Sequence, residues 1–145
     1  MNCNLASMIG ILLITHGTLG DALLANAAHV LGNIPPNAAA MNIAPADRTD
    51  DRLGEARDLA ATLNDGDGVL VLTDIFGATP ANIAGCLLNS EKIEGIAGVS
   101  LPMLVKALAY RTLPLTEVVA KALDGGAHGQ IRIKEDCCHA TQGGS

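Results

Sequence analysis

Two short apolar runs in this chain each end at an ionisable residue. His16 follows the run at 11–15, and Asp74 follows the run at 69–73. A parallel strand that is buried on both faces has this composition, and open α/β sheets bind ligands just beyond the carboxyl ends of such strands. A carboxylate that accepts the Nδ1 proton of a histidine fixes the tautomer of the ring and leaves Nε2 free as a nucleophile or ligand. The sequence therefore predicts a His–Asp pair, provided that the two strands are neighbours.

The residues around this pair favour phosphoryl transfer. An imidazole with a free Nε2 is a good nucleophile for phosphorus, and histidine forms covalent intermediates. The three oxygens of a transferred phosphoryl group need donors. Thr79 offers a hydroxyl group, and the turn Gly77-Ala78-Thr79 precedes a predicted helix whose first N–H groups favour anions, while Gly17 lets the backbone approach closely. No Walker lysine motif and no evident Mg²⁺ ligands occur, so the predicted site passes on a phosphoryl group and does not take it from ATP.

Each of these residues also has a purely structural interpretation. A single histidine at a strand end is more often packed or solvated than catalytic, and Asp-x-x-Gly is a common turn former. Taken one by one, the residues favour the structural interpretation. Their pairing at the ends of two strands, with a capped helix beside one of them, makes the two interpretations evenly balanced. The other histidines, His29, His128 and His139, are expected on the surface. Cys137-Cys138-His139 lacks the second ligand cluster of a zinc site, and neither a metal nor a cofactor is expected.

The elements that must position these residues alternate along the chain. Apolar runs predict strands at 8–15, 38–44, 69–73 and 93–99, and helical spacing predicts helices at 19–31, 47–64, 79–88, 102–111 and 116–124. Thr79 is expected as the N-cap of the third helix, followed by Pro80. The last helix is expected to end before Gly125-Gly126, which leaves His128 in a glycine-rich loop.

This order predicts an α/β three-layer sandwich with helices on both faces of a central sheet. Four strands are expected to form a mostly parallel sheet. Residues 130–134 alternate polar and apolar side chains, as an edge strand with one wet face does. They are therefore predicted to add one antiparallel C-terminal edge strand.

Length and composition describe a single domain with no nucleic-acid partner. The 145 residues suit one domain at 8–134, with an N-terminal extension at 1–7 and a polar tail at 135–145 that is expected to be disordered. A net charge of −6, with one Tyr, one Phe and no Trp, argues against binding to phosphate backbones or stacked bases. No apolar stretch approaches the ~20 residues of a membrane span, and no signal sequence begins the chain, so a cytoplasmic location is expected.

Three segments resemble motifs of the IIA components of the mannose-type (mannose/fructose/sorbose) bacterial phosphoenolpyruvate-dependent sugar phosphotransferase system. They are IGILLITHG at 9–17, LTDIFGATPAN at 72–82 and IAGVSLPML at 96–104. The motifs keep the family's order and approximate spacing, and the resemblance covers about residues 8–134. It implies that His16 is phosphorylated, that Asp74 orients it and that Thr79 contacts the phosphoryl group.

The resemblance also implies partners. The phosphoryl donor would be the histidine-phosphorylated carrier protein HPr, and the acceptor would be a IIB domain. Members of the family are dimers in which a C-terminal strand crosses to the partner's sheet, and residues 130–134 would be that strand here. The chain would be peripheral to a membrane transporter at most.

The chain departs from the family's best-known members in two ways, and several functions stay open. Phe76 stands where they have a tryptophan, and the sequence does not continue into a linker and a IIB domain. A stand-alone regulatory phosphoprotein is therefore an alternative to a role in sugar uptake. The phosphoryl donor subunit of dihydroxyacetone kinase is another, although segment 98–103 fits the mannose type better. A nucleotide- or small-ligand-binding domain without a covalent step is disfavoured, since neither G-x-G-x-x-G nor G-x-x-x-x-G-K-[ST] occurs.

Overall fold

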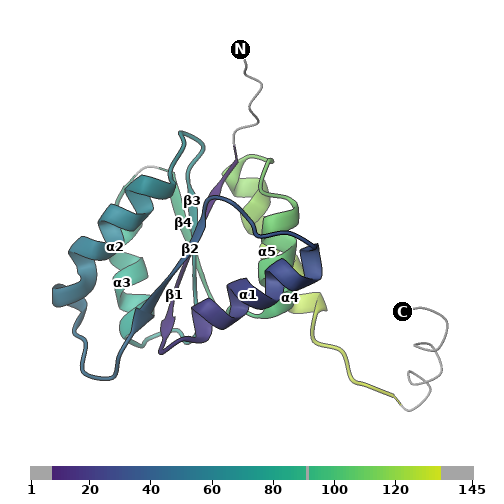
Figure 1. Cartoon of the computed structure of the whole chain (residues 1–145), viewed down its shortest axis with the longest axis horizontal. Coiled ribbons are helices and arrows are strands. Elements are labelled where there is room, and N and C mark those ends of the chain that lie inside the picture. Colours follow the sequence, from purple (N-terminus) through teal and green to yellow (C-terminus); the bar gives the residue numbers. More distant parts are fainter. Residues whose placement is uncertain (1–7, 91, 135–145) are drawn as a thin grey trace.

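The computed structural model describes residues 8–90 and 92–134, in which strands and helices alternate (Figure 1). The strands are β1 (Gly10–His16), β2 (Ala38–Ile43), β3 (Val69–Thr73) and β4 (Ile93–Ala97). The helices are α1 (Leu19–Leu31), α2 (Thr49–Leu63), α3 (Thr79–Leu87), α4 (Leu101–Ala109) and α5 (Leu115–His128). Apart from the end of α5, these boundaries lie within two residues of those predicted from the sequence.

The four strands form one parallel sheet in the order β2-β1-β3-β4. Ile14 of β1 lies opposite Met41 of β2 and Thr73 of β3. Since parallel strands end at the same edge, this register brings His16 and Asp74 to one carboxyl edge. β2, the next strand in the chain, lies on one side of β1, and β3 lies on the other side of β1. Open α/β sheets bind their ligands at such a reversal of strand order.

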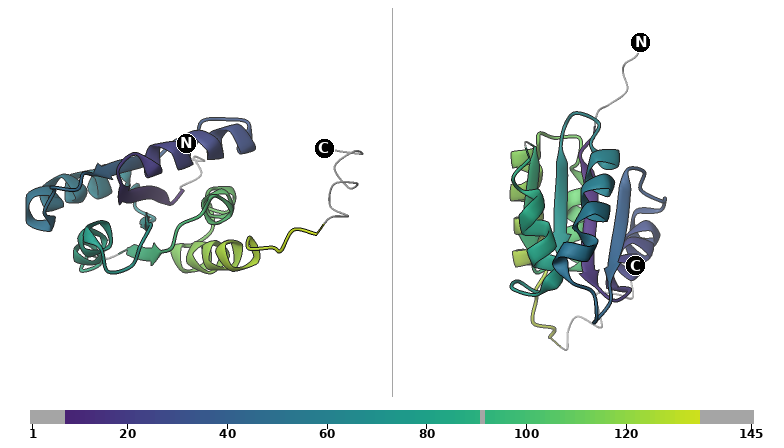
Figure 2. Two further views of the ribbon diagram at one scale, coloured as in Figure 1. Left: turned by 90° about the horizontal axis from the view of Figure 1, so that it is seen from below. Right: turned by 90° about the vertical axis from the view of Figure 1, so that its left-hand side faces the viewer.

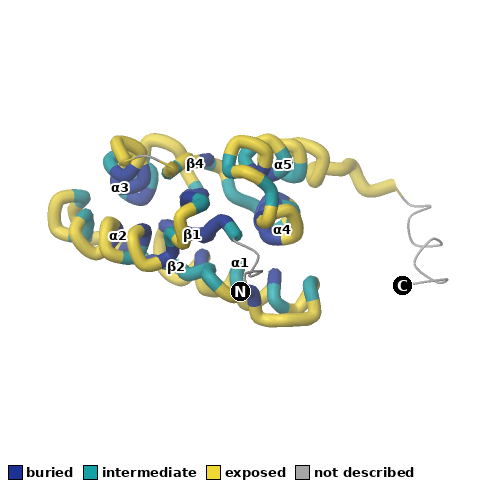
Figure 3. The backbone as a smooth tube through the Cα atoms, turned by 90° about the horizontal axis from the view of Figure 1, so that it is seen from above, coloured by how far each residue is buried: buried dark blue, intermediate teal, exposed yellow. Residues whose placement is uncertain are grey.

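Helices cover both faces of this sheet. α1, α4 and α5 lie on one face, and α2 and α3 lie on the other (Figure 1 and Figure 2). Residues 11–14 of β1 are all apolar because Ile11 and Leu13 pack toward the first group of helices, while Leu12 and Ile14 pack toward the second. All four side chains are fully buried, and the buried parts of the chain face the interior between the layers (Figure 3). The predicted α/β three-layer architecture is therefore confirmed.

The last helix does not end before its glycine pair. α5 continues through Gly125 and Gly126 to His128, which is an exposed helical residue and does not lie in a loop. A Cβ atom at Gly125 would lie 2.7 Å from Cβ of Lys106 on α4, so the missing side chain lets α4 and α5 pack closely. The prediction was wrong because a glycine that permits a close helix contact looks, in sequence, like one that ends a helix.

Residues 130–134 form no strand within the described chain. They follow α5 as an exposed segment that leaves the body of the domain (Figure 1), so β4 is an edge of the sheet without a second neighbouring strand in the described part of the chain. Exchange of this segment between two subunits is a property of a dimer and stays a prediction. The extension at 1–7, the tail at 135–145, and with it Cys137, Cys138 and His139, lie outside the described residues.

Candidate active site

His16 and Asp74 are in direct contact. Nδ1 of His16 lies 3.0 Å from Oδ2 of Asp74, and the backbone N–H of His16 donates to the same oxygen at 3.0 Å. The other carboxylate oxygen accepts the N–H of Ile75 at 2.9 Å. Because an ionised carboxylate only accepts hydrogen bonds, this geometry assigns the ring proton to Nδ1 and leaves the Nε2 lone pair free. The His16 side chain is 47% exposed and that of Asp74 only 11%, so the ring is open to solvent while its partner is shielded.

The surroundings of Asp74 keep its carboxyl group ionised. Burial alone would raise its pKa, but the hydrogen bonds from the backbone and ring of His16 and from the N–H of Ile75 outweigh burial and lower the pKa below its usual value. Asp74 is therefore charged at neutral pH. A fixed negative charge at this position stabilises positive charge that develops on the His16 ring.

A second turn holds the backbone of Asp74 in place. The N–H of Gly98 donates to the carbonyl oxygens of Thr73 at 2.9 Å and Asp74 at 2.8 Å, and the N–H of Val99 donates to Thr73 at 2.9 Å. Gly98 has a φ of +91°, which favours glycine. These bonds tie Gly98 and Val99 to the end of β3, where Asp74 begins the turn. Sequence analysis had assigned Gly98 no role, because backbone donors leave no signal in the residue types.

The turn that follows β1 is fixed from two sides. Gly17 has a φ of +52°, and its N–H donates to the carbonyl of Ile43 at the end of β2, at 2.9 Å. That N–H is therefore engaged, and what Gly17 supplies is its backbone conformation. The buried hydroxyl of Thr15 accepts the N–H of Gly20, in the first turn of α1, at 2.7 Å. Sequence analysis missed this role of Thr15, because a threonine inside an apolar run looks like an ordinary strand residue.

Gly77, Ala78 and Thr79 form the turn that leads into α3. Gly77 has a φ of +91°, and a Cβ atom there would meet nothing within 4 Å, so conformation and not space requires a glycine. Ala78 is the N-cap and Thr79 the first helical residue, which corrects the predicted N-cap at Thr79. No hydrogen bond joins Thr79 to His16 or Asp74 within residues 8–90 and 92–134. The structure thus brings the His–Asp pair together and leaves the Thr79 hydroxyl without a bond to either member.

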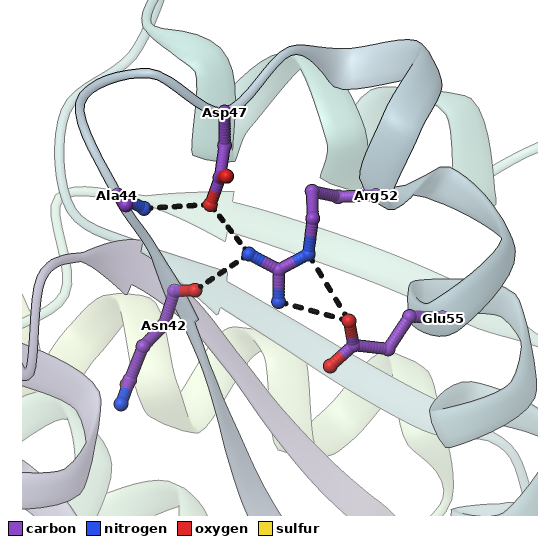
Figure 4. A network of polar contacts seen from close by, with 5 residues as sticks. All are labelled: Asn42, Ala44, Asp47, Arg52 and Glu55. Carbon is purple, nitrogen blue, oxygen red and sulfur yellow. Dashed lines mark hydrogen bonds and ion pairs between the residues drawn. The ribbon is translucent and has the colours of Figure 1, made fainter.

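A charged network fixes the loop after β2, beside the same edge of the sheet. Asp47 accepts the N–H of Ala44 at 2.8 Å and Nη1 of Arg52 at 2.5 Å (Figure 4). Arg52 also donates to the carbonyl of Asn42 and, through Nε and Nη2, to Glu55. The guanidinium group therefore joins the end of β2 to the start of α2. Burial would lower the pKa of Arg52, but the hydrogen bonds that it donates to the two carboxylates outweigh burial and raise the pKa.

Three apolar side chains are exposed in the turns that carry the pair. Leu19, at the start of α1, is 42% exposed, and Ile75 and Phe76, directly after Asp74, are 62% and 86% exposed. Isolated apolar residues on a surface are common, but a group of them beside a reactive side chain is typical of a protein contact site. A pocket of about 730 Å³ lies elsewhere, near Asp67 and Lys92. The His–Asp pair does not line this pocket but lies on the open surface. An open location suits the exchange of a group with another protein.

Neither a metal-binding cluster nor a membrane-spanning helix occurs within residues 8–90 and 92–134. Within these ranges no three His, Cys, Asp or Glu side chains gather closely enough to bind a metal ion. None of the helices described has the length and apolar character needed to cross a membrane.

Comparison with known proteins identifies the family. The family model of the fructose IIA component of the phosphotransferase system matches residues 10–123. The mannose-specific EIIAB component of Escherichia coli (strain K12) is 33% identical over 129 residues, which are 87% of this chain and 40% of that protein. The chain therefore spans less than half the length of this relative.

Solved structures of similar fold lead to the same family. The EIIA component from Streptococcus agalactiae has a TM-score of 0.77 at 25% identity, over 86% of this chain and 97% of that one. The mannose/sorbose-specific IIA subunit from Enterococcus faecalis has a TM-score of 0.78 at 21% identity, over 88% of this chain and 96% of that one. Both His16 and Asp74 lie within the residues that the family model matches. The chain belongs to the mannose-type IIA family of the phosphotransferase system.

Proposed function

We propose that this chain is a phosphohistidine carrier of a bacterial sugar phosphotransferase system. It accepts a phosphoryl group on Nε2 of His16 from phospho-HPr and passes it to a IIB domain for carbohydrate uptake. The observation that supports this best is the 3.0 Å contact between Nδ1 of His16 and Asp74, because it presents Nε2 as the free nucleophile. The Nε2 lone pair forms a bond to phosphorus while the P–N bond of the donor breaks, and the electron pair of that bond returns to the donor histidine.

The neighbouring residues have distinct roles in this proposal. Asp74 orients the ring and stabilises the positive charge that it gains on phosphorylation. The hydroxyl of Thr79 donates a hydrogen bond to a phosphoryl oxygen. The first N–H groups of α3, which have no partner within the helix, donate to the phosphoryl oxygens as well. Gly17 and Gly77, with Ala78, shape the two turns so that backbone can approach the phosphoryl group.

Exchange between proteins suits the exposure of the site. A phosphoryl group that moves between histidines of two proteins needs an open nucleophile and a surface on which the partner can dock. His16 is exposed, and Ile75 and Phe76 supply apolar surface next to it. HPr and a IIB domain would dock here in turn, since one ring serves both transfers.

The same proposal includes the wider organisation of the protein. Residues 8–134 form the IIA domain, which acts in the cytoplasm as a homodimer and is at most peripheral to a membrane transporter. Residues 130–134 pair with the sheet of the partner subunit.

Intact-mass measurement after incubation with phosphoenolpyruvate, enzyme I and HPr tests the carrier function. The protein is expected to gain one phosphoryl mass, and to lose it when a IIB domain is added. His16→Ala should gain none, whereas His29→Ala, His128→Ala and His139→Ala should gain one phosphoryl mass, as the protein without substitutions does. A phosphoryl label that persists in the His16 variant contradicts the assignment.

A further inference from the structure

Arg111 is a buried cation outside the site described above. It lies just after α4 and is 8% exposed. One of its Nη atoms donates to the carbonyl of Pro36, while its backbone carbonyl accepts the N–H of Ile9 at 2.9 Å. A guanidinium group has five N–H donors, and the side chain has no other hydrogen bond and no ion pair within the part of the chain that the structure describes. Most of its donors are therefore available to another acceptor.

The guanidinium group of Arg111, unpaired in the described chain, is unusual when it is compared with that of Arg52. Arg52 is paired with the carboxylates of Asp47 and Glu55, as expected for an arginine that only holds the fold together. Burial lowers the pKa of Arg111, and no carboxylate in the described chain offsets that effect. Its guanidinium nitrogens are not among the fully buried side-chain atoms without a hydrogen-bond partner in the described residues, so the unpaired ones are open to the pocket that Arg111 lines. An anion bound there would accept their hydrogen bonds.

Arg111 lines a pocket that is otherwise largely apolar. The pocket has a volume of about 550 Å³, and its walls include the apolar residues Met8, Leu31, Ile34, Pro35 and Leu108 and the polar residue Asn33. Arg111 is the one cationic side chain among the described lining residues. The pocket lies where β1 and β2 begin, whereas His16 is at the far end of β1. The six residues of β1 that precede His16 separate the two by roughly 20 Å.

We infer that this pocket binds an organic carboxylate with a short apolar body. A carboxylate matches the paired N–H donors of a guanidinium group, and the apolar walls would receive a chain of about six carbons. A phosphate dianion fits less well, because a single cation would face its two charges and Asn33 is the one other polar side chain among the described lining residues. The guanidinium group of Arg111 and the mostly apolar walls around it thus set the ligand class.

Calorimetric titration with hexanoate, at constant ionic strength and neutral pH, tests this site. Hexanoate is expected to bind at least about tenfold more tightly than acetate, since each buried methylene favours binding. Hexan-1-ol, which has the apolar chain without the charge, should bind much more weakly than hexanoate. Equal affinity for the acid and the alcohol would show a non-specific apolar surface, and inorganic phosphate binding as well as hexanoate would show a different ligand class. Either result overturns the proposal.

Variants locate the binding. Arg111→Gln should abolish hexanoate binding, whereas Arg57→Gln, which changes an exposed arginine, should leave it intact. In case Arg111→Gln does not fold, NMR chemical-shift mapping on the unmodified protein gives a second answer. Hexanoate should shift the signals of Leu31, Ile34 and Leu108, and shifts confined to other residues contradict the site.

The carrier function and this pocket can fail independently. His16→Ala should still bind hexanoate, and folded Arg111→Gln should still be phosphorylated by phospho-HPr. Loss of hexanoate binding in His16→Ala would assign the ligand to the phosphoryl site and overturn the separate pocket.

Discussion

Asp74 is expected to accelerate phosphorylation of His16, because it holds the ring proton on Nδ1 and so leaves Nε2 free to react. Asp74→Asn keeps the size of the side chain but removes the negative charge and one strong acceptor. The rate of transfer from phospho-HPr should fall by roughly 10²- to 10⁴-fold, the usual effect of such groups, while the far-UV circular dichroism stays that of the folded protein. Quench-flow kinetics measure the rate. A rate within about twofold of the unmodified protein would make Asp74 a turn residue only.

Thr79 should matter less than Asp74. Thr79→Ala removes one hydroxyl donor to the phosphoryl group, but the first N–H groups of α3 remain to bind its oxygens. The same quench-flow measurement should give a smaller loss of rate than Asp74→Asn does. Thr79→Ser, which retains the hydroxyl, is the matched control and should restore most of the rate. A Thr79→Ala loss as large as that of Asp74→Asn would contradict this ranking.

The lowered pKa of Asp74 makes the stability of the fold depend on pH. Hydrogen bonds in the folded state lower this pKa below the ordinary value of 3.8, so near that pH the unfolded chain binds more protons than the folded one. The contribution of Asp74 is therefore complete above pH 3.8 and is lost as the pH falls through the folded-state value. Urea unfolding from about pH 5 to about pH 2 should show a steep loss of stability that is weaker in Asp74→Asn. Parallel curves for the two proteins would refute this origin.

At the scale of residues, the sequence predicted the reactive pair but not what holds it. His16 and Asp74 could be found because side chains with chemistry follow recognisable strands. The donors from Ile75 and Gly98 could not, since every residue carries a backbone N–H and only the fold decides where it points. Arg111 was likewise not predicted, because burial of a charged residue has no signature in the sequence.

At the scale of elements, α4 and α5 depend on a contact that tolerates no side chain. A Cβ atom at Gly125 would approach Cβ of Lys106 to 2.7 Å. Gly125→Ala should therefore lower the free energy of unfolding by about 1–2 kcal/mol, because overpacking outweighs the better helix propensity of alanine. Gly54→Ala in α2, where a Cβ atom would meet nothing within 4 Å, is the control and should be stabilising by about 0.5–1 kcal/mol. Chemical denaturation compares the two, and a stabilised Gly125→Ala would disprove the close packing.

The elements differ in how well their own residues predicted their boundaries. Strands such as β1 were predictable because both their faces are buried, which leaves an uninterrupted apolar run. The end of α5 was not predictable, because the sequence shows Gly125-Gly126 but does not show the α4 surface against which they pack. Local residue types predict an element, and a neighbouring element decides how far it extends.

At the scale of the whole molecule, the two edges of the sheet carry different chemistry. The carboxyl edge holds the His–Asp pair, and the amino edge holds the pocket of Arg111. The strand order β2-β1-β3-β4 puts the reversal of the chain at the His–Asp pair. The sequence alone could predict a parallel sheet but not this order, because alternating strands and helices are compatible with several arrangements.

A dimer formed through residues 130–134 is the prediction that belongs to the whole molecule. In the described chain, Ile131 and Ile133 are 76% and 84% exposed, and β4 is an edge strand of the sheet. An open sheet edge has unpaired backbone groups, and an exposed segment with apolar side chains has surface to bury. If the segment of one copy pairs with the sheet edge of a second copy, both features are stabilised. The segment follows the end of α5 and leads away from its own domain (Figure 2), which suits a contact with a second subunit.

Two truncations separate this contact from the rest of the C-terminus. Deletion of residues 129–145 should shift the protein toward monomer, because it removes the pairing segment, whereas deletion of 135–145 alone should leave the dimer intact. Sedimentation equilibrium measures the association constant of each form. The double substitution Ile131→Ser and Ile133→Ser tests the apolar contribution within the full-length chain and should weaken association in the same direction. A protein without residues 129–145 that is still fully dimeric would show that the main interface lies elsewhere.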